Sequence, residues 1–279
     1  MKNIFSIDIE SWVHFYIDSL KIKPAAITGS ARRELDNSYI ADAIEKILDL
    51  LDEYRQQATF FVVAEIYDWY PDVIKEIAKR GHEIGYHTHS HLVLQNKEIL
   101  ERELEKSKDF IAAFQPVGFR APQIYIQNDS FAVLKQYGFK YSSSTYDSYR
   151  VMDINGVAEI PVSALSFRQR NNSSQKLPKQ LTAKLLWKKI PFGSGLFIAL
   201  FGSKTSYFID KINKNNQPAV LFVHPWQLYK TREINSVPFK LKMLSRNPAC
   251  LPYLATILNP VKKLFKQYQF TSFKDYYGY

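Results

Sequence analysis

Short apolar segments alternate with amphipathic segments along most of this chain, and this alternation limits the possible folds more than any other feature. Segments typical of buried strands are residues 3–10, 58–64, 82–86, 139–145, 159–162 and 218–223. Segments with apolar side chains at helical spacing are residues 39–54, 71–80, 97–114 and 129–137. Strands that alternate with helices predict an α/β fold built on a parallel sheet, either open or closed into a barrel. Ser38 is expected to cap the first of these helices.

Half of the six histidines lie within the five residues from His87 to His91. One helical turn would place His87 and His91 on the same face, because they are four residues apart. Two neutral imidazoles on one face can bind a single divalent metal, although this spacing alone is also common in sites that bind nothing.

Two acidic residues, Asp8 and Glu10, end the first apolar segment. Being two apart, they point to the same face of a strand. A pair of carboxylates at the end of a buried strand is costly unless something uses it. The alternative is a solvated strand end or the cap of a following helix.

Two later segments carry further polar residues that are typical of active sites. Arg120 stands in the sequence Gly-Phe-Arg-Ala-Pro, and its guanidinium is suited to holding a carboxylate. His224 follows the apolar segment 218–223 and precedes a proline that ends strand pairing. Taken singly, Arg120 is expected at the surface and His224 in the core; together with Asp8 and the histidine cluster they indicate a site.

These four motifs, in this order, resemble the polysaccharide deacetylases of carbohydrate esterase family 4 and related metal-dependent C–N hydrolases. The resemblance covers about residues 1–230 and rests on Ser-Ile-Asp-Ile-Glu10, His87-Thr-His-Ser-His91, Arg120-Ala-Pro122 and Leu-Phe-Val-His224. The first motif has the Asp-x-Glu form in place of the commoner Asp-Asp pair. Gln123 stands where many members have an aromatic residue. The resemblance implies a distorted or incomplete (β/α) barrel.

The resemblance also implies a role for each motif residue. Glu10, His87 and His91 would bind one divalent metal, with Zn²⁺ expected first and Co²⁺, Ni²⁺ or Fe²⁺ as alternatives. Asp8 would act as general base, Arg120 would orient it, and His224 would protonate the leaving amine.

Three further residues near the motifs are expected to contact substrate. They are Trp226, Pro122 and Tyr86. The alternative for Trp226 is a place in the core, which aromatic residues fill first.

Length and composition favour one large domain, and the resemblance implies a catalytic barrel over residues 1–230, followed by a C-terminal segment, residues 231–279. The chain has 279 residues, of which 46% are hydrophobic. Residues 239–246 and 261–268 mix lysines and arginine with Leu, Phe and Tyr, which predicts amphipathic segments packed on the barrel or lying on a membrane surface. The apolar run 196–201 is predicted to be a buried strand or helix start, or else a lid.

Charge and cysteine content narrow the partners and the compartment. The net charge of +10 favours anionic partners, but no nucleic-acid-binding motif is present. A single cysteine excludes an intramolecular disulfide. If Met1 is the native start, the lack of a signal-peptide pattern predicts a cytoplasmic protein, with peripheral contact at the inner membrane face as an alternative.

The sequence therefore predicts a metal-dependent hydrolase that removes an N-acyl group, N-acetyl above all, from an amino sugar in a glycan or a lipid- or nucleotide-linked precursor. One alternative keeps the site but changes the substrate: a deformylase of a lipid-linked amino sugar, or a hydrolase of small amides or cyclic imides. Another alternative is a glycan-binding module without catalysis.

Overall fold

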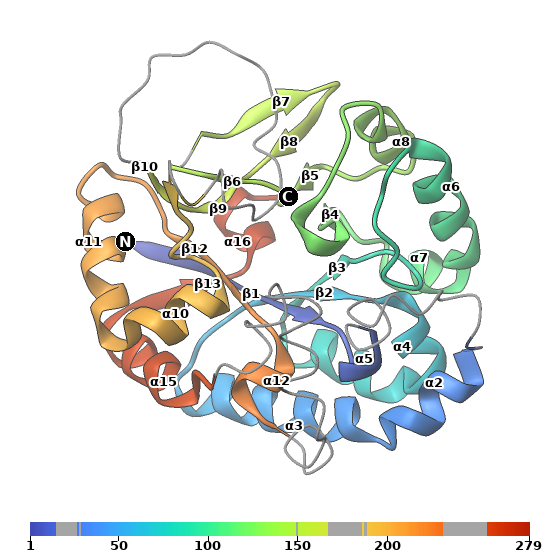
Figure 1. Ribbon diagram of the computed structural model, residues 1–279, viewed down its shortest axis with the longest axis horizontal. Coiled ribbons are helices and arrows are strands. Elements are labelled where there is room, and N and C mark those ends of the chain that lie inside the picture. Colours follow the sequence, from blue (N-terminus) through green and yellow to red (C-terminus); the bar gives the residue numbers. More distant parts are fainter. Residues whose placement is uncertain (15–26, 28, 149, 167–185, 187–188, 231–255) are drawn as a thin grey trace.

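The computed structural model of the protein describes residues 1–14, 27, 29–148, 150–166, 186, 189–230 and 256–279. Figure 1 shows a curled sheet with helices packed around its outside. The basic segment 239–246 lies outside the described residues.

The main sheet runs in the order β12-β1-β2-β3-β4-β5-β8-β7, and β13 also pairs with β1. All neighbours are parallel except β7 and β8. The strands are β1 (Lys2–Ile9), β2 (Thr59–Val62), β3 (Glu83–Tyr86), β4 (Gly118–Phe119), β5 (Tyr141–Ser142), β7 (Met152–Ile154), β8 (Val157–Glu159), β12 (Val220–Val223) and β13 (Gln269–Thr271).

A short connection through Gly193 links β12, at one end of this sheet, to Ser163, which follows β8 near the other end. Two smaller sheets pair β6 (Tyr146–Asp147) with β9 (Val162–Ser163), and β10 (Leu165–Ser166) with β11 (Lys189–Ile190). Gly193 donates its N–H to the carbonyl of Ser163 and accepts the N–H of Phe222 on β12. A Cβ at Gly193 would lie 2.4 Å from the carbonyl oxygen of Val220, so only glycine fits between these strands. The result is the predicted incomplete α/β barrel.

Helices cover the outside of the barrel (Figure 1). They are α2 (Gly29–Asp36), α3 (Tyr39–Glu53), α4 (Ala64–Trp69), α5 (Pro71–Lys79), α6 (Lys97–Lys106), α7 (Lys108–Phe114), α8 (Ser130–Gln136), α10 (Gly195–Phe201), α11 (Thr205–Asn213), α12 (Pro225–Leu228) and α15 (Leu258–Gln267). The short helix α16 (Phe273–Tyr277) lies instead near the middle of the view in Figure 1, where Phe273 packs on Phe61 and Tyr141. The 3₁₀ turns are η2 (Pro122–Ile124) and η3 (Gly202–Lys204). Every residue of β1 after Lys2 is buried, as a strand covered on both faces requires.

Two details of the helices differ from the sequence-based expectation. The single helix expected over residues 97–114 is two helices, α6 and α7. Ser107 lies at the break and donates its hydroxyl to the carbonyl of Glu103, which competes with regular helical bonding. Ser38 is a left-handed residue at φ 64° without a capping side-chain bond, so the predicted cap is wrong. Asp36 instead accepts the N–H of Ile40.

The described part of the predicted C-terminal segment, residues 256–279, is built into the barrel. β13 extends the main sheet beside β1, and α15 buries Val261, Leu264 and Phe265. The apolar face of α15 is therefore used in the core rather than at a membrane. The boundary at residue 230 stays a prediction, since residues 231–255 lie outside the described part.

The apolar run 196–201 forms α10, which confirms the helix interpretation. Phe197 and Ile198 are buried, whereas Leu200 is 71% exposed. Among the described residues, no helix combines the length and the apolar composition that crossing a membrane would need.

Gly118 on β4 leaves room for the ring of Tyr141, which lies on the neighbouring strand β5. A Cβ at Gly118 would lie 2.2 Å from the Tyr141 hydroxyl, which donates to Glu83 Oε1, and the Tyr141 side chain is fully buried. We expect Gly118→Ala to lower the free energy of unfolding by about 2 kcal/mol, because the ring cannot move aside. Urea denaturation measures this change. Gly29→Ala, where the nearest atom is 3.7 Å away, is the control and should have a much smaller effect. Equal stability of the two variants would contradict the packing argument.

Candidate metal centre

Four polar side chains meet at the carboxyl end of β1. Glu10, just beyond the strand, is 3% exposed. Its Oε1 lies 3.1 Å from Nε2 of His87, 3.2 Å from Nε2 of His91 and 3.4 Å from Nε2 of His224. The structure thus brings together residues that are up to 214 positions apart in the sequence, as the resemblance implied.

The segment from His87 to His91 is a loop, so the expected helical turn is wrong. Thr88 at φ 62° and His91 at φ 58° both adopt left-handed conformations, which are costly for side-chain-bearing residues and cluster at functional sites. The start of α4 supports the loop: Ala64 donates to the carbonyl of Thr88 and Glu65 to that of His89. These turns, rather than helical spacing, bring the His87 and His91 rings to 5.1 Å between centroids.

A backbone hydrogen bond defines which nitrogen of His87 faces the site. Nδ1 lies 2.7 Å from the carbonyl oxygen of Arg120, which can only accept, so Nδ1 carries the proton. In the neutral imidazole, Nε2 therefore directs its lone pair toward Glu10. Histidine ligands of metals are commonly oriented in this way.

Asp8 forms a fully buried ion pair with Arg120. Nη1 of Arg120 donates to Asp8 Oδ1 at 2.7 Å and to Ser6 Oγ at 2.9 Å. Nε and Nη2 donate to the carbonyl and hydroxyl oxygens of Ser143, each at 2.9 Å. Arg120 is 0% exposed and lies over the rings of Phe61 and Phe222, so the sequence-based alternative of a surface residue is wrong.

His224 is the most accessible of the charged and imidazole groups around Glu10. Its side chain is 15% exposed, against 1% for His87 and 3% for His91. Its backbone N–H donates to Gln227 Oε1, and its ring stacks on Trp226 at 4.6 Å between centroids.

The charge of Glu10 depends on these imidazoles. Burial alone would raise its pKa, but His91, His224 and His87 together hold the pKa of this carboxyl well below its usual range. Its other oxygen, Oε2, is buried and has no hydrogen-bond partner among the described residues. An ionised carboxylate with an unused oxygen beside two imidazoles suits a divalent transition metal.

Two overlapping sets of residues could hold such an ion. The ligand atoms of Glu10, His87 and His91 lie within 4.8 Å of one another, and so do those of Asp8, Glu10 and His224. The first set agrees with the ligands that the resemblance implies. It also leaves Asp8 and His224 for proton transfer, so we take it as the candidate metal site.

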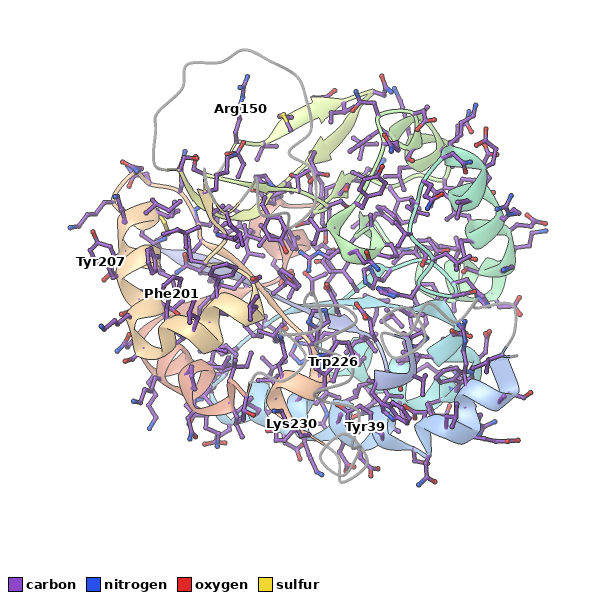
Figure 2. The ribbon with its side chains drawn as sticks, in the orientation of Figure 1. Tyr39, Arg150, Phe201, Tyr207, Trp226 and Lys230 are labelled. Atoms are coloured by element: carbon purple, nitrogen blue, oxygen red, sulfur yellow. The ribbon has the colours of Figure 1, made fainter. Side chains whose placement is uncertain are left out.

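Two of the three predicted substrate residues have no exposed surface. Tyr86 is fully buried, contacts Ser107 through its hydroxyl and packs on Phe139. Trp226, labelled near α12 in Figure 2, is also fully buried, and its ring stacks on that of His224. The burial of Tyr86 and Trp226 favours a place in the core for both rings, and their contact with substrate stays a prediction. Pro122 is buried at the start of η2, and its contact with substrate stays a prediction.

Sequence reasoning missed a buried network beside His91. His14 Nε2 lies 2.8 Å from Glu65 Oε1, Glu65 also pairs with Arg32, and the His14 ring contacts that of His91 at 6.2 Å between centroids. The position of His14, four residues after Glu10, could have indicated it. Nothing in the sequence links Glu65 or Arg32 to the site.

Two family models together match most of the chain. Residues 34–142 match the polysaccharide deacetylase model, and residues 142–278 match a domain of unknown function, DUF3473. The chain carries a polysaccharide deacetylase domain. The match confirms the resemblance seen in the motifs.

Curated relatives of this polysaccharide deacetylase domain include a peptidoglycan-N-acetylglucosamine deacetylase from Bacillus cereus, 36% identical over 34% of this chain and 46% of that protein. A chitooligosaccharide deacetylase from Rhizobium leguminosarum is 32% identical over 33% of this chain and 39% of that protein. The chain thus spans less than half the length of these relatives.

A solved structure of a polysaccharide deacetylase family protein from Mycobacterium smegmatis matches the whole architecture. It covers 95% of this chain and 89% of its own, with a TM-score of 0.55 at 17% identity. This likeness confirms the predicted fold class.

Metal binding can be tested within the histidine cluster itself. We expect His91→Ala to weaken Zn²⁺ binding at least ~100-fold, because it removes one of three ligands. His89→Ala is the matched control: its ring points to Asp68, 3.9 Å away, so its affinity should match that of the unmodified protein. Titration calorimetry against a competing chelator measures both. Equal loss in the two variants would count against the proposed ligand set.

The carboxyl group of Glu159, which is buried near Arg120, should make the free energy of unfolding depend on pH. Burial raises the pKa of Glu159 from 4.5 to about 7. Because the folded state binds this proton more tightly, its stabilising contribution is complete below pH 4.5 and is lost as the pH rises toward 7. Between these values the unfolding free energy should fall by about 2 to 3 kcal/mol more in the unmodified protein than in Glu159→Gln. Urea denaturation across this range measures the difference. The exposed Glu45→Gln is the control, and parallel curves for all three proteins would refute the prediction.

Proposed function

We propose that the protein is a metal-dependent hydrolase that removes an N-acetyl group from an amino sugar in a glycan or glycan precursor. One observation carries the proposal: a single buried carboxylate, Glu10, is contacted by the imidazoles of His87 and His91, and a second carboxylate, Asp8, and the accessible imidazole of His224 lie close to it. Amide hydrolysis needs this combination, because a water must be activated and an amine must be protonated as it leaves.

Glu10, His87 and His91 would hold the metal, and Zn²⁺ is the first candidate, with Co²⁺, Ni²⁺ and Fe²⁺ as alternatives. Such an ion lowers the pKa of water and polarises an amide carbonyl.

Asp8 is the proposed general base. Its carboxylate lies beside Glu10, where it can accept a proton from the attacking water. The guanidinium of Arg120 donates to Asp8 Oδ1 at 2.7 Å, which holds the carboxylate in one orientation and compensates its buried charge.

His224 is the proposed general acid. It directly follows β12 with its Nε2 3.4 Å from Glu10 Oε1, and its partial exposure would let a leaving amine reach it. The stacked Trp226 ring and the Gln227 side chain restrict its movement. A proton given at the amine nitrogen completes the cleavage of the C–N bond.

The relatives support an N-acetylated glucosamine unit as the substrate. Their names specify peptidoglycan N-acetylglucosamine and chitooligosaccharide as what those proteins act on. Lipid or nucleotide linkage, a formyl group in place of acetyl, and small amides or cyclic imides stay alternatives on the same site. The cytoplasmic location and the membrane contact also stay predictions.

Asp8→Asn provides a direct test of this function. We expect it to lower kcat at least ~100-fold, since the amide cannot accept the proton, while metal content stays at one ion per chain. Acetate release is measured on N-acetylglucosamine oligomers, nucleotide sugars and lipid-linked sugars, with formate release and small amides measured in parallel. The exposed Asp42→Asn on α3 is the control and should keep full activity.

Each alternative predicts a different result in this assay. Formate release, or turnover of small amides alone, would identify one of the hydrolase alternatives. Binding of oligosaccharides that Asp8→Asn leaves unchanged, without product from any substrate, would refute hydrolysis and favour a glycan-binding module.

A further inference from the structure

Glu159 is a buried carboxyl that the proposed reaction does not use. It ends β8, is 0% exposed and lies on the strand next to β5. Its Oε1 accepts the N–H of Ser144 and the hydroxyl of Thr145, each at 2.8 Å. Burying a carboxyl is costly, and the environment raises its pKa to about 7. A neutral side chain at position 159 would avoid this cost, so the presence of a glutamate there needs an explanation.

The segment that Glu159 holds, residues 142–145, is also the direct support of Arg120. Ser143 accepts two hydrogen bonds from the guanidinium, through its carbonyl and its hydroxyl. Ser144 accepts the N–H of Ala121 through its hydroxyl, which in turn contacts the hydroxyl of Ser142. Each of these serines is 0% exposed.

The contacts form a continuous chain from Glu159 to the proposed base. Glu159 binds residues 144 and 145, Ser143 binds the guanidinium, and the guanidinium binds Asp8. One of these contacts also lies near a metal ligand, because the Arg120 carbonyl that accepts from His87 and the Ala121 N–H that donates to Ser144 belong to the same peptide group. The backbone of Arg120, whose carbonyl accepts from His87, is held by its own N–H bond to Tyr86 on β3.

We propose that Glu159 is a positioning residue, which keeps residues 142–145 in the conformation that directs Arg120 at Asp8. The proposal rests on the proposed function for its catalytic consequence. It assigns Glu159 a larger effect on the base than on the metal, because the peptide that accepts from His87 has a second support in the Arg120 N–H bond to Tyr86, whereas Ser143 provides two of the four hydrogen bonds of the guanidinium.

The test compares Glu159→Ala and Glu159→Gln with Glu83→Gln. Glu83 is another buried carboxyl, at the start of β3 and so at the other end of the barrel, where it accepts from Thr59, Tyr141 and the backbone N–H of Lys274. Measured for each variant are kcat, KM, the bound Zn²⁺ and the Nε–H resonance of Arg120 in arginine-labelled protein, assigned through Arg120→Lys.

We expect Glu159→Ala to lower kcat by ~10- to 100-fold, with KM within about 2-fold and Zn²⁺ content unchanged, because a displaced base costs rate without loss of binding. Its Arg120 Nε–H resonance should shift or exchange rapidly with solvent. Glu159→Gln, which keeps the accepting oxygen, should restore most of kcat and the resonance. Glu83→Gln should lower thermal stability and leave kcat and the resonance unchanged.

Two results would overturn the proposal. The first is that the Arg120 Nε–H resonance of Glu159→Ala matches that of the unmodified protein. The second is that Glu159→Ala and Glu83→Gln lose kcat and bound Zn²⁺ to the same extent. Failure of the proposed function is a separate outcome. It would show as absence of product from the unmodified protein on every substrate, and the resonance of Arg120 would still decide whether Glu159 positions it.

Discussion

The interior of the barrel is organised around one buried cation, the guanidinium of Arg120. It has no exposed surface, and it donates to groups on β1 and directly after β5 while it packs on rings from β2 and β12. A buried charge that loses one partner costs about 3 to 5 kcal/mol. The surrounding strands are therefore constrained to present Asp8, Ser6 and Ser143 at defined places, and the same constraint orients the carboxylate that the proposed reaction needs.

A second constraint lies next to the first. Glu10 is an equally buried anion, but its neighbours are imidazoles, which can share a metal with it. Asp8 and Glu10 are only two residues apart, yet one is paired with a fixed cation and the other with titratable rings. This separation of environments allows two carboxylates at one strand end to serve different purposes, one as a base and one as a ligand.

Much of the site could be predicted because its residues follow strands whose apolar character is visible in the sequence. Asp8, Glu10, Arg120 and His224 each end a buried segment, and carboxyl ends of parallel strands meet at one edge. The conformation of residues 87–91 could not be predicted, since two left-handed residues bring the imidazoles together in place of a helical turn. The sequence left open whether Trp226 lies in the core, and the burial of Tyr86 was not expected, because closeness in sequence to a site residue does not determine on which face of a strand or helix a side chain lies.

The sequence by itself determined the alternation of strands and helices, the order of the four motifs and the chemical types at the site, because these depend on local periodicity and on residue identity. Only the tertiary structure decided which groups touch. Networks such as Glu65 with His14 and Glu159 with residues 144 and 145 join segments by hydrogen bonds whose partners have no fixed spacing along the chain. Folding of the barrel brings such partners together, so their pairing has no trace in a single sequence.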